Sequence, residues 1–368
     1  MQITCYHDGA PLDWDRRMAA AGPAAGLCQT TYWARVIQQI DRARPLFIEV
    51  CEDNLQTPVL SLLLFQKSPW DRHRQRRNYR AVVWTAWSAW LEWFDGPVVH
   101  SDRNGDVVEA FGVLLTWVRE FVQRNGLSGV KALGIPRASP WASDQRLDAL
   151  FVGQGYSSAR WGTYLTDLTL DEAALWRRIH HSARKSVNKA RSMRTTIRRI
   201  SSYDDYVARF HRPYCEIESA AGRRANPLTV AERMWREDRD GYYHYYVAES
   251  TEGETLATLG MYVFNGVATE VASALSPKAF EHKIPAQDLL HWEMLLEAKR
   301  AGCHTFDLAG VDPSATDHKA AGIRRFKEKW GGRYVEYSRY ELEMPSALVA
   351  LRKALGRVAR VLHRRSRK

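Results

Sequence analysis

The sequence predicts a mixed α/β (α+β) fold built from two similar domains in tandem. A chain of 368 residues is long enough to form two cores of ordinary size. Hydrophobic residues make up 45% of it, with 14 Trp and 16 Tyr, which is typical of a folded protein. Each half also shows the same order of predicted elements: a meander of antiparallel strands, then helix, strand, helix and strand. We therefore expect domains at residues 1–170 and 171–343, followed by a basic tail at residues 344–368.

The first half is predicted to alternate apolar strands with amphipathic helices. In a helical entry segment, residues 1–43, apolar residues from Trp33 to Ile40 recur at helical spacing. Lys67–Arg80, with six Lys/Arg and one Asp, is expected to be an exposed loop, and Asp95-Gly96-Pro97 a turn. The other predicted elements are strands at 46–51, 59–65, 130–135 and 164–170, helices at 106–125 and 147–155, and a Trp-rich run at 82–94.

The second half is predicted to open with a basic amphipathic helix. Thr169 and Glu172 form a capping box, and the helix after them keeps its apolar residues on one stripe up to Ala190. Nine Lys/Arg and no acidic residue lie in 177–199. Asn265-Gly266 is a strong hairpin signal between two strands. The other predicted elements are helices at 206–219, 230–239, 286–301 and 318–330, and strands at 242–248, 256–264, 267–274, 305–309 and 333–342.

Charge and cysteine usage limit the partner and the compartment. The net charge of +11 favours an anionic partner such as nucleic acid, a nucleotide-linked substrate or an acidic membrane surface, with a generally basic surface as the simpler alternative. The five cysteines are far apart and form no metal-ligand or disulfide pattern. The polar N-terminus lacks the regions of a signal peptide, and Ala81–Phe94 is too short to span a bilayer. We expect a cytoplasmic protein.

Several common catalytic motifs are absent from the sequence. It has no P-loop, no dinucleotide-binding turn, no His-Glu-x-x-His and no Gly-x-Ser-x-Gly motif. His180 and His181 are adjacent, so on a helix they point about 100° apart, and we expect no metal and no cofactor. Phe280–Leu290 lies where an acetyl-CoA-dependent N-acetyltransferase would have a glycine-rich pyrophosphate loop. It contains Pro285 and no glycine, which weakens an acyl-CoA interpretation.

The segment Pro285–Tyr337 carries three motifs in succession. They are AQDLLHWE from Ala286 with a following AKRAG, TFDLAGV from Thr305, and GIRRFKEKWGGRYVEY from Gly322. These resemble, in order, the LLxWE…AKxxG, (Y/F)D(F/L)GG and G(L/I)xxFKxxFGGxxxEY segments of the Fem family of aminoacyl-tRNA-dependent peptidyl transferases. Ala309 stands in place of a usual glycine. The resemblance implies two tandem GNAT-like acyltransferase domains.

Weaker matches extend this resemblance over residues 28–342. The segments are Cys28–Ala34, similar to an early QSxxW motif, Asp95–Val98, similar to a GPV turn, and Arg184–Ala190, similar to RxxIxKA. FemA-like members have a long coiled-coil arm, but only one short helix fits between Thr229 and Tyr242. The FemX type, with no coiled-coil arm, is therefore the closer comparison.

The resemblance also implies site residues. In the family a Phe-Lys pair lies in the acceptor channel, where its lysine is associated with transition-state charge or with the tRNA end. Carried over, these catalytic candidates are Phe326 and Lys327; on residue type alone they would be a core anchor and a solvated helix lysine. The further candidates, each of which also fits a solvated or packed surface residue, are Arg35, Arg223, Arg224, Trp33 and Tyr337 for substrate binding, and Arg184, Lys185, Lys189, Arg324 and Arg325 for tRNA binding.

Three basic runs suggest the partners. Residues 67–80, 177–199 and 352–368 hold 23 of the 53 Lys/Arg, as expected for contact with a tRNA acceptor stem or, for the last run, with anionic lipid. The expected function is transfer from aminoacyl-tRNA to an amine acceptor, either a nucleotide- or lipid-linked peptidoglycan precursor or a natural-product amine. The alternatives are an acyl-CoA-dependent GNAT-type N-acyltransferase of cell-envelope or polysaccharide biosynthesis and a non-catalytic RNA-binding protein. We expect a monomer that contacts the inner face of the membrane through its tail.

Overall fold

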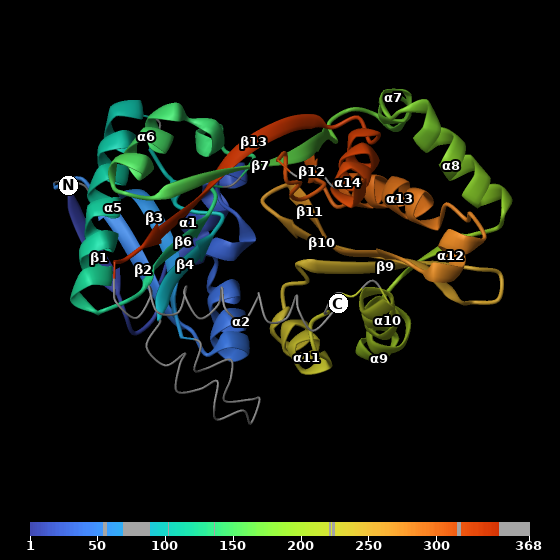
Figure 1. Cartoon of the computed structure of the whole chain (residues 1–368), viewed down its shortest axis with the longest axis horizontal. Helices are drawn as coiled ribbons and strands as arrows, with labels where there is room; N and C mark the ends of the chain where they lie inside the picture. Colours follow the sequence, from blue (N-terminus) through green and yellow to red (C-terminus); the bar gives the residue numbers. More distant parts are fainter. Residues whose placement is uncertain are drawn as a thin grey trace, which may run out of the picture. The chain divides into compact units, whose positions relative to one another are not determined.

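The structure of the chain divides into two compact units. The computed structural model describes residues 1–53, 57–68, 89–101, 103–135, 137–220, 222, 225–314 and 318–345 (Figure 1). Unit 1 comprises residues 1–159 together with the chain from Tyr337 onward, and unit 2 comprises Arg160–Glu336. The chain passes between the units within strand β7 (Ser157–Asp167) and again within β13 (Arg333–Glu343). Each unit mixes helices and strands, so the predicted mixed α/β class is confirmed.

Unit 1 is built on a sheet with the strand order β1-β2-β3-β4-β6-β13. Its other strands are β1 (Gln2–Tyr6), β2 (Arg44–Cys51), β3 (Pro58–Lys67), β4 (Trp90–Phe94) and β6 (Gly129–Leu133), with the short β5 (Val98–Val99) paired to β3. β4 and β6 run parallel and the other neighbours antiparallel.

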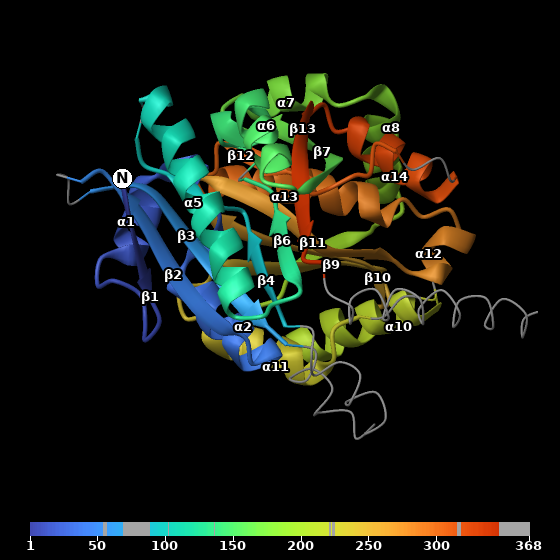
Figure 2. The ribbon, with the colours of Figure 1, turned by 60° about the vertical axis from the view of Figure 1, so that its left-hand side comes forward.

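One long helix supplies much of the core of unit 1. α5 (Asn104–Arg124) lies along the sheet (Figure 2) and buries a stripe at helical spacing, made up of Val107, Phe111, Leu114, Val118 and Val122. The other helices of this unit are α1 (Trp14–Ala20), α2 (Thr31–Asp41) and α6 (Gln145–Gly153), with 3₁₀ turns at Gly22–Ala24, Leu27–Gln29 and Pro140–Ser143.

Unit 2 has a second sheet, with the strand order β7-β12-β11-β10-β9-β8. Its strands after β7 are β8 (Thr196–Arg199), β9 (Tyr243–Glu249), β10 (Thr255–Phe264), β11 (Val267–Leu275) and β12 (Thr305–Asp307). β11 and β12 are parallel, and the other neighbours are antiparallel. Asn265 and Gly266 both have positive φ, 48° and 72°, so the hairpin predicted between β10 and β11 is confirmed.

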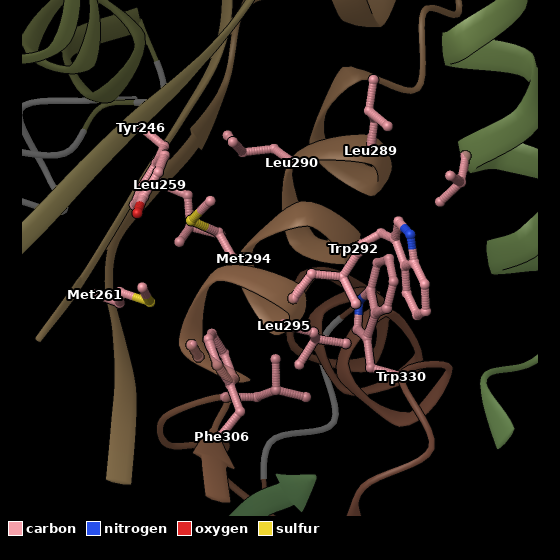
Figure 3. Packing of buried hydrophobic residues seen from close by; sticks show 14 of the residues in the cluster. Tyr246, Leu259, Met261, Leu289, Leu290, Trp292, Met294, Leu295, Phe306 and Trp330 are labelled. Carbon is pink, nitrogen blue, oxygen red and sulfur yellow. The ribbon is translucent and has the colours of Figure 1, made fainter. Parts of the chain in front are cut away.

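The core of unit 2 surrounds helix α13 (Ala286–Arg300), which is buried on most of its sides. Figure 3 shows Leu290, Trp292, Met294 and Leu295 of this helix packed with residues of β9, β10 and β12 and with Trp330. The remaining helices are α7 (Glu172–Arg178), α8 (His181–Ser192), α9 (Tyr203–Asp205), a π-helix at Tyr206–His211, α10 (Arg212–Ala220), α11 (Leu228–Glu237), α12 (Pro277–Glu281) and α14 (His318–Glu328). α11 is the one short helix expected between Thr229 and Tyr242.

Three local predictions are wrong. The entry segment contains a strand, β1, which pairs with β2 although its residues are largely polar. β7 begins at Ser157, seven residues before the predicted strand. The prediction missed this part because the first four residues of β7 are exposed and give no apolar alternation. The helix predicted from the capping box has Asp171 as its N-cap instead of Thr169. The Asp171 carboxylate accepts from the N–H of Ala174 at 2.6 Å, whereas Thr169 donates to Asp167.

The basic helix predicted near 171–190 is also divided in two. Ile179 and His180 have extended backbone angles between α7 and α8. The Nδ1 of His180 accepts from the backbone N–H of Ser182 and caps α8. The backbone N–H of His180 donates to the carbonyl of Lys329 at 2.8 Å. The apolar stripe continues across the break, with Ile179 and Ala183 both buried, which is why periodicity alone predicts a single helix.

Substituting alanine for two glycines, one inside α14 and one just after it, should change the free energy of unfolding in opposite directions. Gly331 has a φ of 71°, and a Cβ there would lie 2.8 Å from the carbonyl oxygen of Arg178, so Gly331→Ala should lower the free energy of unfolding by about 2 kcal/mol. Gly322 lies inside α14 with open space around it, and Gly322→Ala should raise the free energy of unfolding by about 0.5–1 kcal/mol. Urea unfolding of both variants tests this. Equal effects of the two changes would contradict it.

Candidate active site

The candidate active site lies in unit 2, where β11 and β12 part. The two strands pair over three positions only, Val267–Thr269 with Thr305–Asp307. β12 ends at Asp307, while β11 continues to Leu275. Past the last pair, groups at the carboxyl ends of these parallel strands are no longer covered by the neighbouring strand. Open α/β sheets commonly bind ligands at such a position.

Lys327 contacts the segment that follows β12. It lies half-buried on α14, and its Nζ donates to the carbonyl oxygens of Ala309 and Gly310, each at 3.2 Å. An ammonium group carries three N–H donors on a flexible stem, and these two contacts fix its direction. Lys327 is therefore held against the end of β12 by backbone carbonyls.

A buried pair of side chains shapes the backbone that Lys327 binds. Ala309 has a φ of 60°, the left-handed conformation that glycine adopts most easily. Asp307, 2% exposed, accepts from the N–H of Ala309 at 2.9 Å. Thr163 Oγ1 lies 2.5 Å from Asp307 Oδ1 and 2.8 Å from the carbonyl oxygen of Ala309. This conformation explains why glycine is the usual residue here in the family that the sequence resembles.

Phe326, the first residue of the candidate catalytic pair, is anchored in the core of unit 2. The edge of its ring meets the imidazole of His291, with centroids 4.8 Å apart and planes at 80°. The same imidazole stacks on Trp330 at 5.4 Å. The Nζ of Lys329 lies 4.1 Å from the centroid of the Phe326 ring, a cation–π distance. Phe326 thus packs inward on one side and carries a cation over its ring.

Behind Phe326 lies a buried carboxylate–imidazole pair that sequence reasoning missed. Glu270 of β11 and His291 of α13 are 8% and 1% exposed, and Glu270 Oε2 lies 3.2 Å from His291 Nε2. The Nδ1 of His291 lies 2.9 Å from the carbonyl oxygen of Gln287 and 3.2 Å from the side-chain Nε2 of the same residue. The Gln287 side chain in turn donates to Ser273 Oγ at 3.0 Å.

A β-bulge brings these polar groups together. The pairing of β10 with β11 shifts between Thr258 and Gly260, which adds one residue to β11 next to Ala272, whose φ is 50°. In a regular strand, residues three apart point to opposite faces. The extra residue puts Glu270 and Ser273 on the same face, toward α13.

The surroundings of Glu270 favour its ionised form. Burial acts to raise the pKa of Glu270, yet its pKa is lowered, because His291 donates to the carboxylate and the charge of Lys327 and the hydroxyl of Ser273 add to the effect. Glu270 is therefore a carboxylate at neutral pH, and the positive charge of Lys327 favours that ionised form.

A second carboxylate lies at the N-terminus of α13. Asp288, 8% exposed, is in the first turn of this helix and forms an ion pair with Lys329 Nζ. Helix N-termini attract anions because their N–H groups have no partner inside the helix. Here a carboxylate of the protein itself occupies that position.

Comparisons with known proteins agree with this architecture. The sequence model of the FemAB family matches residues 245–339, from β9 to β13, which include most of the groups described above. No curated protein sequence matches the chain.

Solved structures show the same fold over nearly the whole chain. A FemX crystal structure aligns with a TM-score of 0.69 and 13% identity, covering 95% of this chain and 99% of that one. The L-PGS of Bacillus licheniformis aligns with a TM-score of 0.54, 13% identity and coverages of 91% and 94%. A tandem GNAT protein from the clavulanic acid biosynthesis pathway aligns with a TM-score of 0.53 and 13% identity, covering 94% of this chain and 100% of that one. The predicted tandem GNAT-like fold is confirmed.

The predicted tRNA-binding residues lie on two helices of unit 2 and differ in their environments. The guanidinium of Arg184 donates to the carbonyls of Trp176, Arg177 and Ile179 and so caps the end of α7. Lys185 is exposed, and the exposed Lys189 donates to the carbonyl of Lys283. In the FemAB segment, Arg324 and Arg325 are exposed on α14, with Arg324 over the ring of Tyr334 at 5.6 Å.

The predicted substrate-binding residues belong mainly to unit 1. Trp33 is half-buried on α2, with its ring 6.3 Å from Phe94, and Arg35 is exposed and donates to Thr31. Tyr337, at the end of the FemAB segment, is 2% exposed, and Arg137 lies over its ring at 5.6 Å. Arg223 and Arg224 lie outside the described residues.

Unit 1 explains two of the weaker motif matches. The buried amide of Gln29 donates to the carbonyls of Leu63 and Phe94 and accepts from the N–H of Leu63. A Cβ on Gly96 would lie 2.6 Å from the Gln29 amide, so the two motifs meet there and require a residue without a side chain. The hydrogen bonds of Gln29 thus fix the turn after β4 against β3.

Metal sites and membrane spans were sought in the part of the chain that the structure describes. No group of three or more His, Cys, Asp or Glu there could hold a metal ion. Among the same residues, no helix combines the length and apolar character needed to cross a bilayer.

The ionised state of Glu270 predicts a pH-dependent stability. Because its pKa is lowered in the folded protein, the carboxylate stabilises the fold above its ordinary pKa of 4.5, and this contribution is lost as pH falls through the lowered value. The wild type should be more stable than Glu270→Gln above pH 4.5, by about 1 kcal/mol, and the difference should shrink at lower pH. Urea unfolding of both proteins across this range measures it. A difference that stays constant with pH would show that the charge is irrelevant.

Proposed function

We propose that this chain transfers an aminoacyl group from aminoacyl-tRNA to an amine acceptor and forms an amide bond. The FemAB match and the tandem GNAT fold support an acyltransferase of cell-wall biosynthesis. The observation that carries the finer proposal is the position of Phe326 and Lys327, which lie inside the matched segment and at the open end of β12.

The chemistry needs a fixed cation where this lysine lies. The acceptor amine attacks the ester carbonyl of the aminoacyl group, and the carbonyl oxygen becomes an oxyanion. The new C–N bond remains, the C–O bond to the ribose breaks, and a proton from the amine ends on the ribose hydroxyl. An ammonium group that is already oriented stabilises the developing oxyanion without reorganising at the moment of reaction. The contacts of Lys327 with Ala309 and Gly310 provide that orientation.

The N-terminus of α13 favours aminoacyl-tRNA over acyl-CoA as donor. A CoA pyrophosphate would use the N–H groups of such a helix terminus. The carboxylate of Asp288 lies in this first turn, paired with Lys329, and would repel a second anion. The absence of glycine around Pro285 supports the same choice.

The basic surface supports a tRNA donor, and unit 1 supports an acceptor site. Lys185 on α8 and Arg325 on α14 are exposed cations in unit 2, suited to phosphate contacts. In the first domain, residues 1–170, Trp33 and Arg35 would bind a peptidoglycan precursor or another amine. The tail at 344–368 would add peripheral contact with the inner face of the membrane in a cytoplasmic monomer. Most of that tail lies outside the described residues.

Transfer assays with two donors test the proposal. Labelled aminoacyl-tRNA and labelled acyl-CoA are each offered with candidate amine acceptors, with and without RNase. RNase-sensitive transfer supports the proposal. RNase-insensitive transfer from acyl-CoA would replace it with the GNAT-type alternative, and RNA binding without any transfer would replace it with the RNA-binding alternative.

Removing the fixed cation should slow transfer. We expect Lys327→Ala to reduce turnover at least about tenfold, which corresponds to a loss of about 1.4 kcal/mol of transition-state stabilisation, while the protein stays folded. The matched control is Lys299→Ala, because Lys299 also donates to a backbone carbonyl of unit 2, that of Leu168 at 2.9 Å, but lies on α13 outside the site. Turnover of Lys327→Ala equal to that of the control would refute the role of Lys327.

A further inference from the structure

The pair of Glu270 and His291 touches the candidate catalytic residues, yet the transfer reaction makes no direct use of it. His291 meets the ring of Phe326, the residue before Lys327, and the Glu270 carboxylate lies 3.2 Å from the Nε2 of His291. At 8% and 1% exposed, neither side chain is placed to contact a substrate. We propose that Glu270 and His291 are positioning residues that hold Phe326 and Lys327 in place, an inference that rests on the proposed function of Lys327.

Contacts from the neighbouring elements hold the Glu270–His291 pair itself in place. From α13, the backbone carbonyl and the side-chain amide of Gln287 both contact the Nδ1 of His291, and the amide also donates to Ser273 of β11. From the α14 side, the rings of Phe326 and Trp330 enclose the imidazole at 80° and 17° to its plane. A side chain with both nitrogens bonded and two ring contacts has one orientation. His291 can therefore transmit the position of β11 to Phe326.

Glu270 adds a directional charge to this steric support. Without an opposing charge, a lysine side chain gains entropy and hydration by swinging toward solvent. The ionised carboxylate of Glu270 attracts the ammonium of Lys327, whose Nζ donates to the carbonyls of Ala309 and Gly310. A second carboxylate, that of Asp288 on α13, forms an ion pair with Lys329, two residues after Lys327. The two carboxylates thus hold successive lysines of this segment.

Packing alone does not account for a buried carboxylate and imidazole. Taking both groups out of water is costly, and an apolar pair of similar volume would fill the same space without that cost. The polar pair contributes what an apolar pair lacks, which is a fixed direction and a charge next to Lys327. These two properties serve position more than stability.

Hydrogen exchange of the full-length protein tests the holding role without any substrate. In Glu270→Gln, which keeps the shape but loses the charge, amides of α14 should exchange at least about fivefold faster than in the wild type. His291→Phe, which keeps the aromatic packing but loses both hydrogen bonds, should do the same. The matched control is Glu249→Gln. Glu249 is also a buried carboxylate of unit 2, 4% exposed, but it pairs with Arg198 and Arg209. It should leave exchange of α14 unchanged.

A double-mutant cycle tests whether the pair acts through Lys327. Glu270→Gln should lower kcat about tenfold with KM for the acceptor within about twofold. Added to Lys327→Ala, it should lower kcat no further, because the group that it positions is already gone. A purely structural role would instead lower kcat by the same factor in both backgrounds.

The outcomes separate this inference from the proposed function. Unchanged exchange of α14 in both variants overturns the inference, whatever the transfer assay shows, and so do multiplicative losses of kcat in the cycle. If Glu270→Gln does not fold, His291→Phe decides both experiments. If the wild type transfers no aminoacyl group, the proposed function fails, and the exchange result still decides whether the pair holds α14.

Discussion

The parting of β11 and β12 is the constraint on which the candidate site depends. After Thr269 and Asp307 the two strands no longer share hydrogen bonds, so the carbonyl groups that follow β12 need other donors. A buried carbonyl left without one costs about 1–3 kcal/mol. The positive φ of Ala309 turns the chain so that Thr163 and Lys327 supply those donors. The ammonium group of Lys327 thus donates the hydrogen bond that a neighbouring strand would otherwise supply.

A single inserted residue in β11 determines what lies beside that cation. The bulge near Ala272 points Glu270 and Ser273 toward α13, where Gln287 and His291 stand one helical turn apart. Asp288, the residue after Gln287, forms an ion pair with Lys329 instead. Asp288 thus pairs with Lys329, while Lys327, two residues earlier, donates to the carbonyls of Ala309 and Gly310.

Much of the fold could be predicted from the sequence because its signals are local. The apolar residues of α13 and the Asn265-Gly266 hairpin are visible in short windows, and the predicted bounds agree closely with the structure. The Glu270–His291 pair could not be predicted in this way. A glutamate in the alternating sequence of β11 looks solvent-facing, and nothing near it in the sequence indicates its contact with the distant His291. Arg184 and Lys185 likewise look alike in sequence. The break after α7 turns Arg184 back onto the carbonyls of that helix and leaves Lys185 exposed.

The structural and catalytic interpretations of Lys327 are not exclusive. A lysine that closes the end of β12 is fixed by the fold, and a fixed cation is what charge stabilisation in a transition state requires. A freely solvated lysine would have to lose water and side-chain entropy each time the reaction occurred. Here folding has already supplied most of that ordering, through Ala309, Gly310 and the nearby carboxylate of Glu270. The contacts that make Lys327 look structural are therefore the same contacts that would make it effective in catalysis.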